Sequence, residues 1–331
     1  MSDTDGKWKT GLLASGVPLE YEASLLLTSA GFSVSADYAY SREDAGVAKD
    51  FSVDIEARAT YPFSDPNRIQ AALSLLVECK YRHPRVIWLF LPDPNQPDLS
   101  PITLGSTLHS IDEFSWTVLS ANATVPFDEH IPFALKGVEV NLSNGNAFDA
   151  DIHQGISQLQ YALPRLFSDL VSFNLNGHPR DNVPFFYCPI LLTSAPVYIA
   201  NPTISVADVM AADDIATLGD PHPYIVLYRD YSPDFEQHCV WHFSSLREML
   251  QKAQLKRIHH ARNADPKLLD APLETIKGLL AGQRYFLHSL FSQFIICTLT
   301  AFPDLLAKIS STVDHAMRSS APLQRPKTPA T

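Results

Sequence analysis

The chain has 331 residues, 46% of them hydrophobic, which is enough to bury one large core or two ordinary ones. Its formal net charge of −11 argues against a protein that coats nucleic acid without specificity, because such proteins carry an excess of Lys and Arg. The four cysteines are widely spaced and form no C-x-x-C pair, which excludes a zinc knuckle and favours reduced thiols in a cytoplasmic protein.

The first predicted element is a helix over residues 18–30, in which apolar residues recur at intervals of three and four and Gly31 provides the stop. A short alternating strand is expected at 32–35. A polar stretch over 41–50 then leads into residues 51–57, whose alternating apolar and polar side chains are typical of a half-buried strand. The chain is therefore expected to begin with a helix followed by paired strands.

Two further strands are predicted at 74–81 and 86–91, and the second is almost wholly apolar, which favours a central place in a sheet. Residues 92–147 are rich in Pro, Asp, Asn and Ser and are predicted to form an insertion with small strands of its own. A helix is expected over 149–170, kinked or ended early by Pro164. Strands mixed with helices in this way indicate the α/β class.

Strands return at 185–199 and 224–228, after which residues 244–317 are predicted to be mainly helical. The most apolar run, 286–306, contains polar residues and a proline that would be costly in lipid, so a buried helix is expected there and not a membrane span. The tail from 319 to 331, with its prolines and basic residues, is expected to be disordered.

An acid and an amine lie two residues apart in the otherwise apolar strand predicted at 74–81. Alternate side chains of a strand share a face, so Glu78 and Lys80 should point together while Cys79 points the other way. Burying charge is costly unless the charge is paired or binds a metal. Asp54 occupies the preceding predicted strand, within reach of a hairpin connection, so all three groups are expected to meet at one strand edge.

Two carboxylates and a lysine suit the hydrolysis of a phosphodiester bond. Carboxylate oxygens are the ligands that Mg²⁺ prefers, and Mn²⁺ is expected to substitute for it. The metal polarises the phosphate and lowers the pKa of a bound water, while a lysine ammonium can orient that water and offset charge on the phosphate. The sequence thus predicts metal-dependent chemistry on a phosphate ester.

A glutamate on the first helix, an aspartate on one strand and Glu-x-Lys on the next, here Glu20, Asp54 and Glu78-Cys79-Lys80, resemble the pattern of the PD-(D/E)XK nuclease superfamily. This superfamily includes restriction endonucleases and DNA-repair exonucleases. The resemblance implies that Asp54 and Glu78 bind metal, that Lys80 handles the nucleophile, and that Glu20 supports the metal or its water. Glu22 competes with Glu20, because spacing alone does not show which helix face meets the site.

A second similarity lies in the helix predicted over 149–170. Gln158 and Tyr161 lie about one turn apart and can share a helix face. They are similar to a motif that follows the catalytic core in the exonuclease-like branch, where it contacts the site or the nucleic acid. The long insertion at 92–147 departs from compact members of the superfamily. A position on the helix surface is the alternative for both residues.

The resemblance implies an α/β fold with a restriction-endonuclease-like mixed β-sheet core flanked by helices over residues 10–200. The insertion at 92–147 and a mostly helical C-terminal region over 201–318, packed on the core, would complete it. The implied function is Mg²⁺-dependent hydrolysis of DNA, in restriction or defence against foreign DNA, with a protein partner or homodimer left open. The alternatives are a catalytically inactive nuclease fold that binds or recruits a partner, and a chance match.

His238 and His242 have the His-x-x-x-His spacing that places two imidazoles on one face of a helix in zinc sites. Residues 239–241 read instead as a strand, and the glutamate of zinc hydrolases is replaced by Cys239. The sequence has no serine-nucleophile elbow, phosphate loop or dinucleotide-binding glycine turn. It therefore favours the carboxylate–lysine site over these alternatives.

Overall fold

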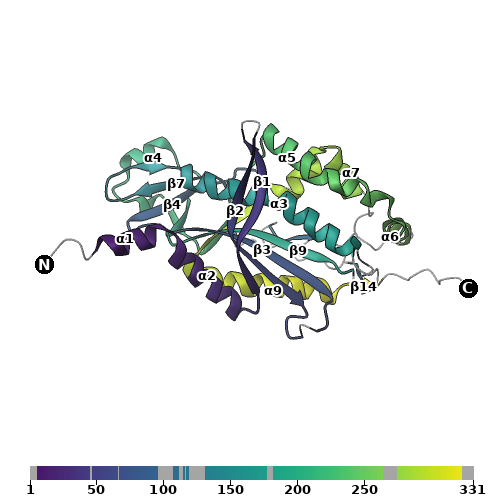
Figure 1. Cartoon of the computed structure of the whole chain (residues 1–331). Helices are drawn as coiled ribbons and strands as arrows, with labels where there is room; N and C mark the ends of the chain where they lie inside the picture. Colours follow the sequence, from purple (N-terminus) through teal and green to yellow (C-terminus); the bar gives the residue numbers. More distant parts are fainter. Residues whose placement is uncertain are drawn as a thin grey trace, which may run out of the picture.

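A computed structural model of the chain contains one large mixed β-sheet with helices on both faces (Figure 1). The structure describes residues 6–44, 47–65, 67–95, 107–111, 115, 117–118, 131–176, 182–263 and 274–322. Its helices are α1 (Lys7–Ala14), α2 (Val17–Ser29), α3 (Ala150–Asn176), α4 (Val206–Ala211), α5 (Pro233–Phe243), α6 (Ala253–Asn263), α7 (Glu274–Leu280), α8 (Arg284–Phe291) and α9 (Phe302–Arg318). The strands of the large sheet are β1 (Ser33–Asp44), β2 (Val47–Tyr61), β3 (Ala71–Lys80), β4 (Val86–Pro92), β5 (His109–Ile111), β7 (Phe133–Asn141), β8 (Ala147–Phe148), β9 (Phe185–Thr193), β10 (Val197–Ala200), β11 (Gly219–Pro221), β12 (Tyr224–Tyr228) and β13 (Gln293–Thr298). A separate two-stranded sheet pairs β6 (Thr117–Val118) with β14 (Ala321–Pro322).

The strands of the large sheet lie in the order β1-β2-β3-β9-β13-β12-β7-β4-β10-β11, with β5 beside β9 and β8 beside β7. The neighbours β3, β9 and β13 run parallel to one another, as do β12 with β7 and β4 with β10. The pairs β1–β2, β2–β3, β12–β13 and β4–β7 are antiparallel. This arrangement confirms the mixed α/β class that the sequence predicts.

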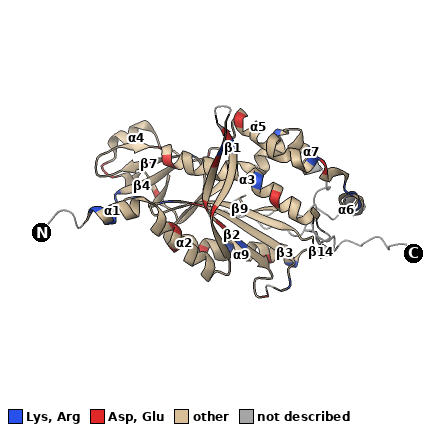
Figure 2. Ribbon diagram, in the orientation of Figure 1, with Lys and Arg blue, Asp and Glu red and all other residues tan. Residues whose placement is uncertain are grey.

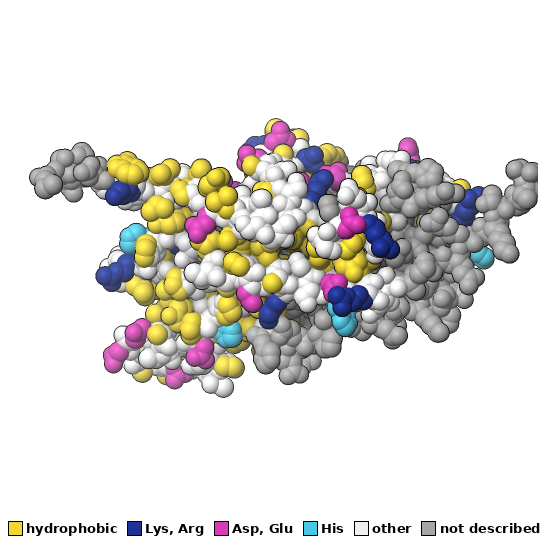
Figure 3. Space-filling view, turned by 90° about the horizontal axis from the view of Figure 1, so that it is seen from below, with side chains coloured by type: hydrophobic (Ala, Val, Ile, Leu, Met, Phe, Trp, Pro, Cys, Tyr) yellow, Lys and Arg dark blue, Asp and Glu magenta, His cyan; other side chains and the backbone are white. Residues whose placement is uncertain are grey.

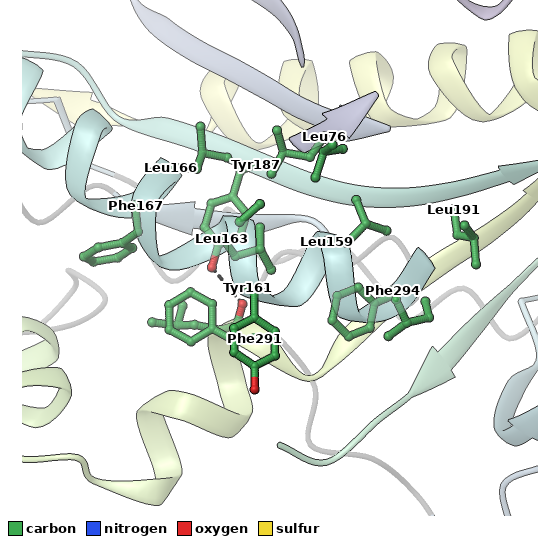
Figure 4. Packing of buried hydrophobic residues seen from close by; sticks show 14 of the residues in the cluster. Leu76, Leu159, Tyr161, Leu163, Leu166, Phe167, Tyr187, Leu191, Phe291 and Phe294 are labelled. Atoms are coloured by element: carbon green, nitrogen blue, oxygen red, sulfur yellow. Dashed lines mark hydrogen bonds between the residues drawn. The ribbon is translucent and has the colours of Figure 1, made fainter. Parts of the chain in front are cut away.

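The sheet separates two layers of apolar side chains. The helix α3 covers one face, and Figure 4 shows Leu159, Leu163 and Leu166 of this helix directed toward Leu76 and Tyr187 of the sheet. The helices α2 and α9 cover the other face (Figure 1), where they pack against the remaining apolar side chains of the same strands. Strand β9 is buried along its whole length because both layers press on it.

The helix α2 agrees with the helix predicted over 18–30. Its buried residues Leu19, Ala23 and Leu27 recur every four positions and form the face that packs on the sheet. The helix ends before Gly31, whose φ of +91° lies in the left-handed region that glycine adopts at little cost. The sequence signals for this helix therefore reflect its real packing and its real end.

The strands β1 and β2 form a hairpin that is longer than predicted. The sequence indicated strands only at 32–35 and 51–57, whereas pairing extends as far as Asp44 and Val47. The outer half of the hairpin stands away from the sheet beside α5 (Figure 1). Its side chains are mostly exposed, so they lack the apolar alternation by which half-buried strands are predicted.

The segment predicted as an insertion, 92–147, supplies the sheet with β5, β7 and β8, and β7 lies between β12 and β4. Residues 96–106 and 119–130 of this segment lie outside the described residues. The helix predicted over 149–170 is α3, which continues through Pro164 to Asn176 instead of ending early. Buried residues on both sides of Pro164 stabilise the helix more than one missing backbone hydrogen bond weakens it.

Beyond residue 201, β12 confirms the strand predicted at 224–228, whereas β13 lies in the part predicted as mainly helical; both strands lie in the middle of the sheet. The run 286–306, predicted as one buried helix, is instead the end of α8, the strand β13 and the start of α9. Short apolar runs fit a buried strand as well as a buried helix, which explains the wrong prediction. The expected boundary near residue 200 does not interrupt the sheet. Of the tail predicted as disordered, 319–331, residues 321–322 instead form β14, and those from 323 onward lie outside the described residues.

Charged and apolar side chains are both distributed over the surface of the molecule. Among the residues coloured in Figure 2, Lys and Arg are spread over several helices and do not gather into one band. Apolar side chains are visible over part of the surface in Figure 3, and α1 and α2 expose Trp8, Leu12, Tyr21 and Leu25. Among the residues that the structure describes, no helix combines the length and apolarity that crossing a bilayer requires.

Candidate active site

The predicted acid and amine lie on β3, on the face that α3 covers. Leu76 belongs to the apolar cluster on the α3 side, and Glu78 and Lys80 follow it at intervals of two. Val77 and Cys79 belong to the cluster on the opposite face. The side chain of Glu78 is 1% exposed to solvent, and that of Lys80 is 14% exposed. Two charges therefore lie under α3 and within a largely apolar layer.

Lys80 holds this site together through two side-chain contacts. Its Nζ donates to Glu78 Oε1 at 2.8 Å and to Gln158 Oε1 at 3.2 Å. Gln158 Nε2 in turn donates to the carbonyl oxygen of Ser52 on β2, at 3.2 Å. The helix α3 approaches closely because residue 155 is glycine: a Cβ there would lie 3.2 Å from Lys80 Cε. The position of the ammonium group is thus fixed from β3, α3 and β2 together.

Asp54 lies on β2 at the point where the alternation of side chains between the two faces of the sheet is interrupted. Its Oδ2 accepts a hydrogen bond of 2.7 Å from the backbone N–H of Cys79 on β3. Val53 packs on the α3 side of the sheet, whereas Ile55 packs on the α2 and α9 side, so regular alternation breaks at Asp54. In the pairing with β1, Ala36 lies opposite Ile55 and Tyr38 opposite Val53, and Asp37 between them has a φ of +56°. This irregularity leaves the Asp54 carboxylate beside β3.

The carboxyl groups at this place disfavour one another's ionisation. Burial, followed by the charge of Asp54, raises the pKa of Glu78 to about 7, while Lys80 and the backbone amide of Asp54 act in the opposite direction. Burial also raises the pKa of Asp54, against the lowering effects of the Cys79 amide and Lys80. Asp37 adds to this repulsion at Asp54. One ammonium group does not neutralise the cluster, which would therefore attract a further cation.

The structure distinguishes the two glutamates of α2. Burial raises the pKa of Glu20, and Asp54 and Asp37 raise it further, so this carboxylate lies within electrostatic reach of the cluster. Glu22 is exposed, on another side of the helix. The Glu20 side chain bends back toward the start of α2, where a Cβ on Gly16 would lie 2.9 Å from its Oε1. Glu20 is thus the helix glutamate that lies near Asp54.

Gln158 and Tyr161, predicted as a supporting pair, point to different neighbours. Gln158 contacts Lys80, as described above, but the Tyr161 hydroxyl donates to Asp234 Oδ2 of α5 at 2.6 Å. The guanidinium of Arg42 lies over the Tyr161 ring, 3.8 Å from its centroid. Figure 4 shows Tyr161 directed away from the leucine layer of α3. Tyr161 therefore belongs to a neighbouring cluster and does not contact Lys80.

The donor set fits a hard divalent cation bound in part by water. Glu78 Oε2 is buried and has no hydrogen-bond partner in the part of the chain that the structure describes. In that same part, no three His, Cys, Asp or Glu side chains form a complete set of metal ligands. Mg²⁺ often binds through one or two carboxylates and keeps several waters, so the Asp54 and Glu78 pair meets its preference.

The histidine pair lies on a helix and not on the strand predicted at 239–241. His238 and His242 are on α5, and their ring centroids are 4.5 Å apart. Nε2 of His238 lies 2.8 Å from the carbonyl oxygen of Tyr161 and is used in that structural hydrogen bond. The helix was missed because the apolar and aromatic residues at 239–241 also suit a strand.

Four residues at or beside the site were not predicted from the sequence. They are Asp37, Tyr40 and Arg42 on β1 and Gly155 on α3. Tyr40 is buried on the α3 side of the hairpin, and burial followed by the charge of Glu78 raises its pKa. The glycine carried a usable signal, because glycine inside a helix is unfavourable unless close packing requires it. The β1 residues carried none, since the strand was predicted to end at residue 35.

No protein-family model, no curated protein and no solved structure matches this chain. The geometry of the site and its residue types are therefore the basis for its chemistry.

Proposed function

We propose that the chain is a Mg²⁺-dependent deoxyribonuclease with a PD-(D/E)XK-type site on a restriction-endonuclease-like core. One observation carries the proposal. Lys80 Nζ is held between Glu78 and Gln158, next to a second carboxylate at Asp54, while the other oxygen of Glu78 is buried without a partner. An apolar sheet gains nothing in stability from such a group, since an unsatisfied buried oxygen is costly. A metal ligand role accounts for it.

Asp54 and Glu78 would hold the metal, and Glu20 would bind one of its waters. When bound, the ion polarises the scissile phosphate and lowers the pKa of a coordinated water. The two carboxylates come from neighbouring strands that pair side by side, and this gives them a rigid separation. The bent conformation of Glu20 and its place on α2 leave it free to turn toward the ion by a change of rotamer.

Lys80 would act on the nucleophile and on the developing charge. Its ammonium group is kept in place by Glu78 and Gln158, so it needs no reorganisation when the phosphate arrives. Positioned in this way, it can orient the attacking water and offset negative charge on the phosphate. Gln158 is a positioning residue, because it contacts Lys80 and the β2 backbone.

DNA is the proposed substrate because the residue pattern resembles nucleases that act on DNA. The proposed setting is the cytoplasm, in restriction or defence against foreign DNA. The net charge of −11 does not favour general attraction of DNA, so binding would depend on the metal and on a few local contacts. We accordingly expect weak binding of duplex DNA in chelator and stronger binding of duplex DNA with the ion present.

The experiment is cleavage of plasmid and linear DNA by the purified protein in Mg²⁺, in Mn²⁺ and in EDTA. Asp54→Asn, Glu78→Gln and Lys80→Met are each expected to lower the rate by at least about a hundredfold, since each removes a group that acts on the reacting atoms. Glu56→Gln is the matched control. Glu56 is another buried carboxylate of β2, but it pairs with Arg58 and not with Lys80.

Cleavage that persists in EDTA, or that Asp54→Asn leaves unchanged, would contradict the proposal. Metal-dependent DNA binding without any cleavage would favour the alternative, an inactive nuclease fold that recruits a partner. Thermal melting of each variant checks that the loss of activity does not come from unfolding.

A further inference from the structure

A cavity of about 690 Å³ lies between the outer half of the β1–β2 hairpin and the helix α5. The hairpin contributes Arg42 and Glu43 to its lining, and α5 contributes Asp234, Gln237, His238 and Trp241. Its size is in the range of cavities that hold small organic molecules. None of these residues has a role in the proposed hydrolysis.

The cavity is connected to the candidate site through α3 and β1. Gln158 of α3 contacts Lys80, and Tyr161, about one turn further along, contacts Asp234 at the cavity. On β1, Tyr40 lies within electrostatic reach of both Glu78 and Arg42. The contacts with Lys80 and with the cavity lining thus lie about one turn apart along α3.

The lining suits a flat group with N–H donors and does not suit a phosphate. Arg42 Nη2 is already paired with Asp234 Oδ2 at 3.0 Å, so its charge is offset, and Glu43 adds a second carboxylate. Arg42 Nε is buried and has no hydrogen-bond partner among the described residues, which leaves one donor for an acceptor atom of a ligand. Trp241 is 58% exposed and offers a ring for stacking.

We propose that this cavity receives an unstacked base of the DNA strand whose phosphate lies at Lys80, with a preference for bases that carry an exocyclic amino group. The inference rests on the proposed function and adds to it a site for the base next to the cleaved bond. Trp241 stacks on the base, Asp234 or Glu43 accepts from the amino group, and Arg42 Nε donates to a ring nitrogen or carbonyl. A duplex would need to open locally at this position, so single-stranded or mismatched DNA binds more readily.

The test measures binding apart from cleavage. Dye-labelled single-stranded oligonucleotides are titrated with the full chain in EDTA, and the dissociation constant is read from fluorescence anisotropy. Trp241→Ala is expected to weaken binding about tenfold, the usual effect of losing one base-stacking aromatic. Trp8→Ala is the matched control, because Trp8 is 59% exposed and Trp241 58%, but Trp8 lies on α1. Its dissociation constant is expected to stay within about twofold of the unmodified chain.

The base preference is tested with oligo-dC and oligo-dT, two pyrimidines that differ in the amino group. The unmodified chain is expected to bind oligo-dC several-fold more tightly, and Asp234→Ala is expected to reduce this ratio. Equal affinities of the Trp241→Ala variant and the unmodified chain would overturn the inference, as would failure of the unmodified chain to bind single strands. DNA cleavage with no effect of Trp241→Ala rejects the cavity alone. A clear effect of Trp241→Ala without cleavage rejects the hydrolysis and retains the cavity.

Discussion

Gly155 lies where α3 crosses the side chain of Lys80. A Cβ at this position would lie 2.6 Å from Leu191 Cδ1 and 3.2 Å from Lys80 Cε, so the neighbours would have to move. We expect Gly155→Ala to destabilise the protein by about 1–3 kcal/mol, as overpacking does, and to lower DNA cleavage by displacing Lys80. Urea unfolding and the cleavage rate measure the two effects.

Gly11→Ala provides the control for this substitution. Gly11 also lies in a helix, but a Cβ there would meet nothing within 4 Å, so alanine should be neutral or slightly stabilising. A Gly155→Ala variant with unchanged stability and rate would show that α3 does not press on Lys80.

Glu78 should make the metal-free protein less stable as the pH rises. Its pKa is raised from 4.5 to about 7 in the folded state, so between these values the folded chain holds a proton that the unfolded chain has lost. Stability is therefore lost as the pH increases through this window, by up to about 3 kcal/mol. Glu78→Gln cannot ionise and should gain stability relative to the unmodified chain between pH 5 and pH 8.

Urea midpoints in EDTA at both pH values measure this difference, with Glu56→Gln as the control for a buried carboxylate of the neighbouring strand. If Glu78→Gln instead became less stable than the unmodified chain at the higher pH, the ionised form of Glu78 would stabilise the fold, which would contradict the raised pKa.

Residues of the site were predictable where charge stands out from its surroundings. Asp54, Glu78 and Lys80 interrupt apolar strands, and that contrast is visible in a single sequence. Asp37 and Arg42 lie in a polar stretch, where another charge carries no information. The choice between Glu20 and Glu22 also required the structure, because it depends on how α2 is rotated against the sheet.

At the scale of the elements, the hairpin depends on the left-handed backbone of Asp37. Its φ of +56° is tolerated by Asp, Asn and Gly but is costly for a β-branched residue. We expect Asp37→Val to lower the free energy of unfolding by about 1–2 kcal/mol, and Asp37→Gly to preserve it. Chemical denaturation of both variants gives the comparison.

Ser35→Val is the control for added bulk on the same strand. Ser35 is exposed and its backbone is ordinary for a strand, where valine is favourable. If Asp37→Val and Asp37→Gly were equally stable, the interrupted side-chain alternation of β2 at Asp54 would not depend on the backbone conformation of residue 37.

Elements were predictable where one face alone is buried. The helix α2 shows clear periodicity because one side contacts the core and the other contacts water. β13 is buried on both faces, and residues 39–43 of β1 are exposed or half-buried except for Tyr40, so each lacks the contrast that a pattern needs. Tertiary pairing decides both, and pairing is not encoded in local spacing.

For the molecule as a whole, the sheet cannot be divided at residue 200. β13 pairs with β9, and β12 lies beyond it, so a fragment of residues 1–200 would lose the strands that cover one edge of β9. We expect this fragment to lack a cooperative unfolding transition and to aggregate, because an apolar strand edge is exposed. Circular dichroism and size-exclusion chromatography report on both properties.

Two substitutions in the full chain serve as controls for the fragment. Ile296→Ala, at a fully buried position of β13, should cost about 2–5 kcal/mol. Val206→Ala, at an exposed position of α4, should change stability by less than about 0.5 kcal/mol. A soluble fragment with a sharp transition would show instead that the first 200 residues form an independent unit.

The late arrival of β13 also bears on how the chain is made. A ribosome completes β9 at Thr193 and begins β13 at Gln293, an interval of roughly 5–20 s at ordinary translation rates. During that interval the part of β9 that will pair with β13 has one open edge, while its other edge can pair with β3, which carries Glu78 and Lys80. Until β13 has been made, this edge of β9 is open to aggregation, and the sheet around Glu78 and Lys80 is completed only after Thr298.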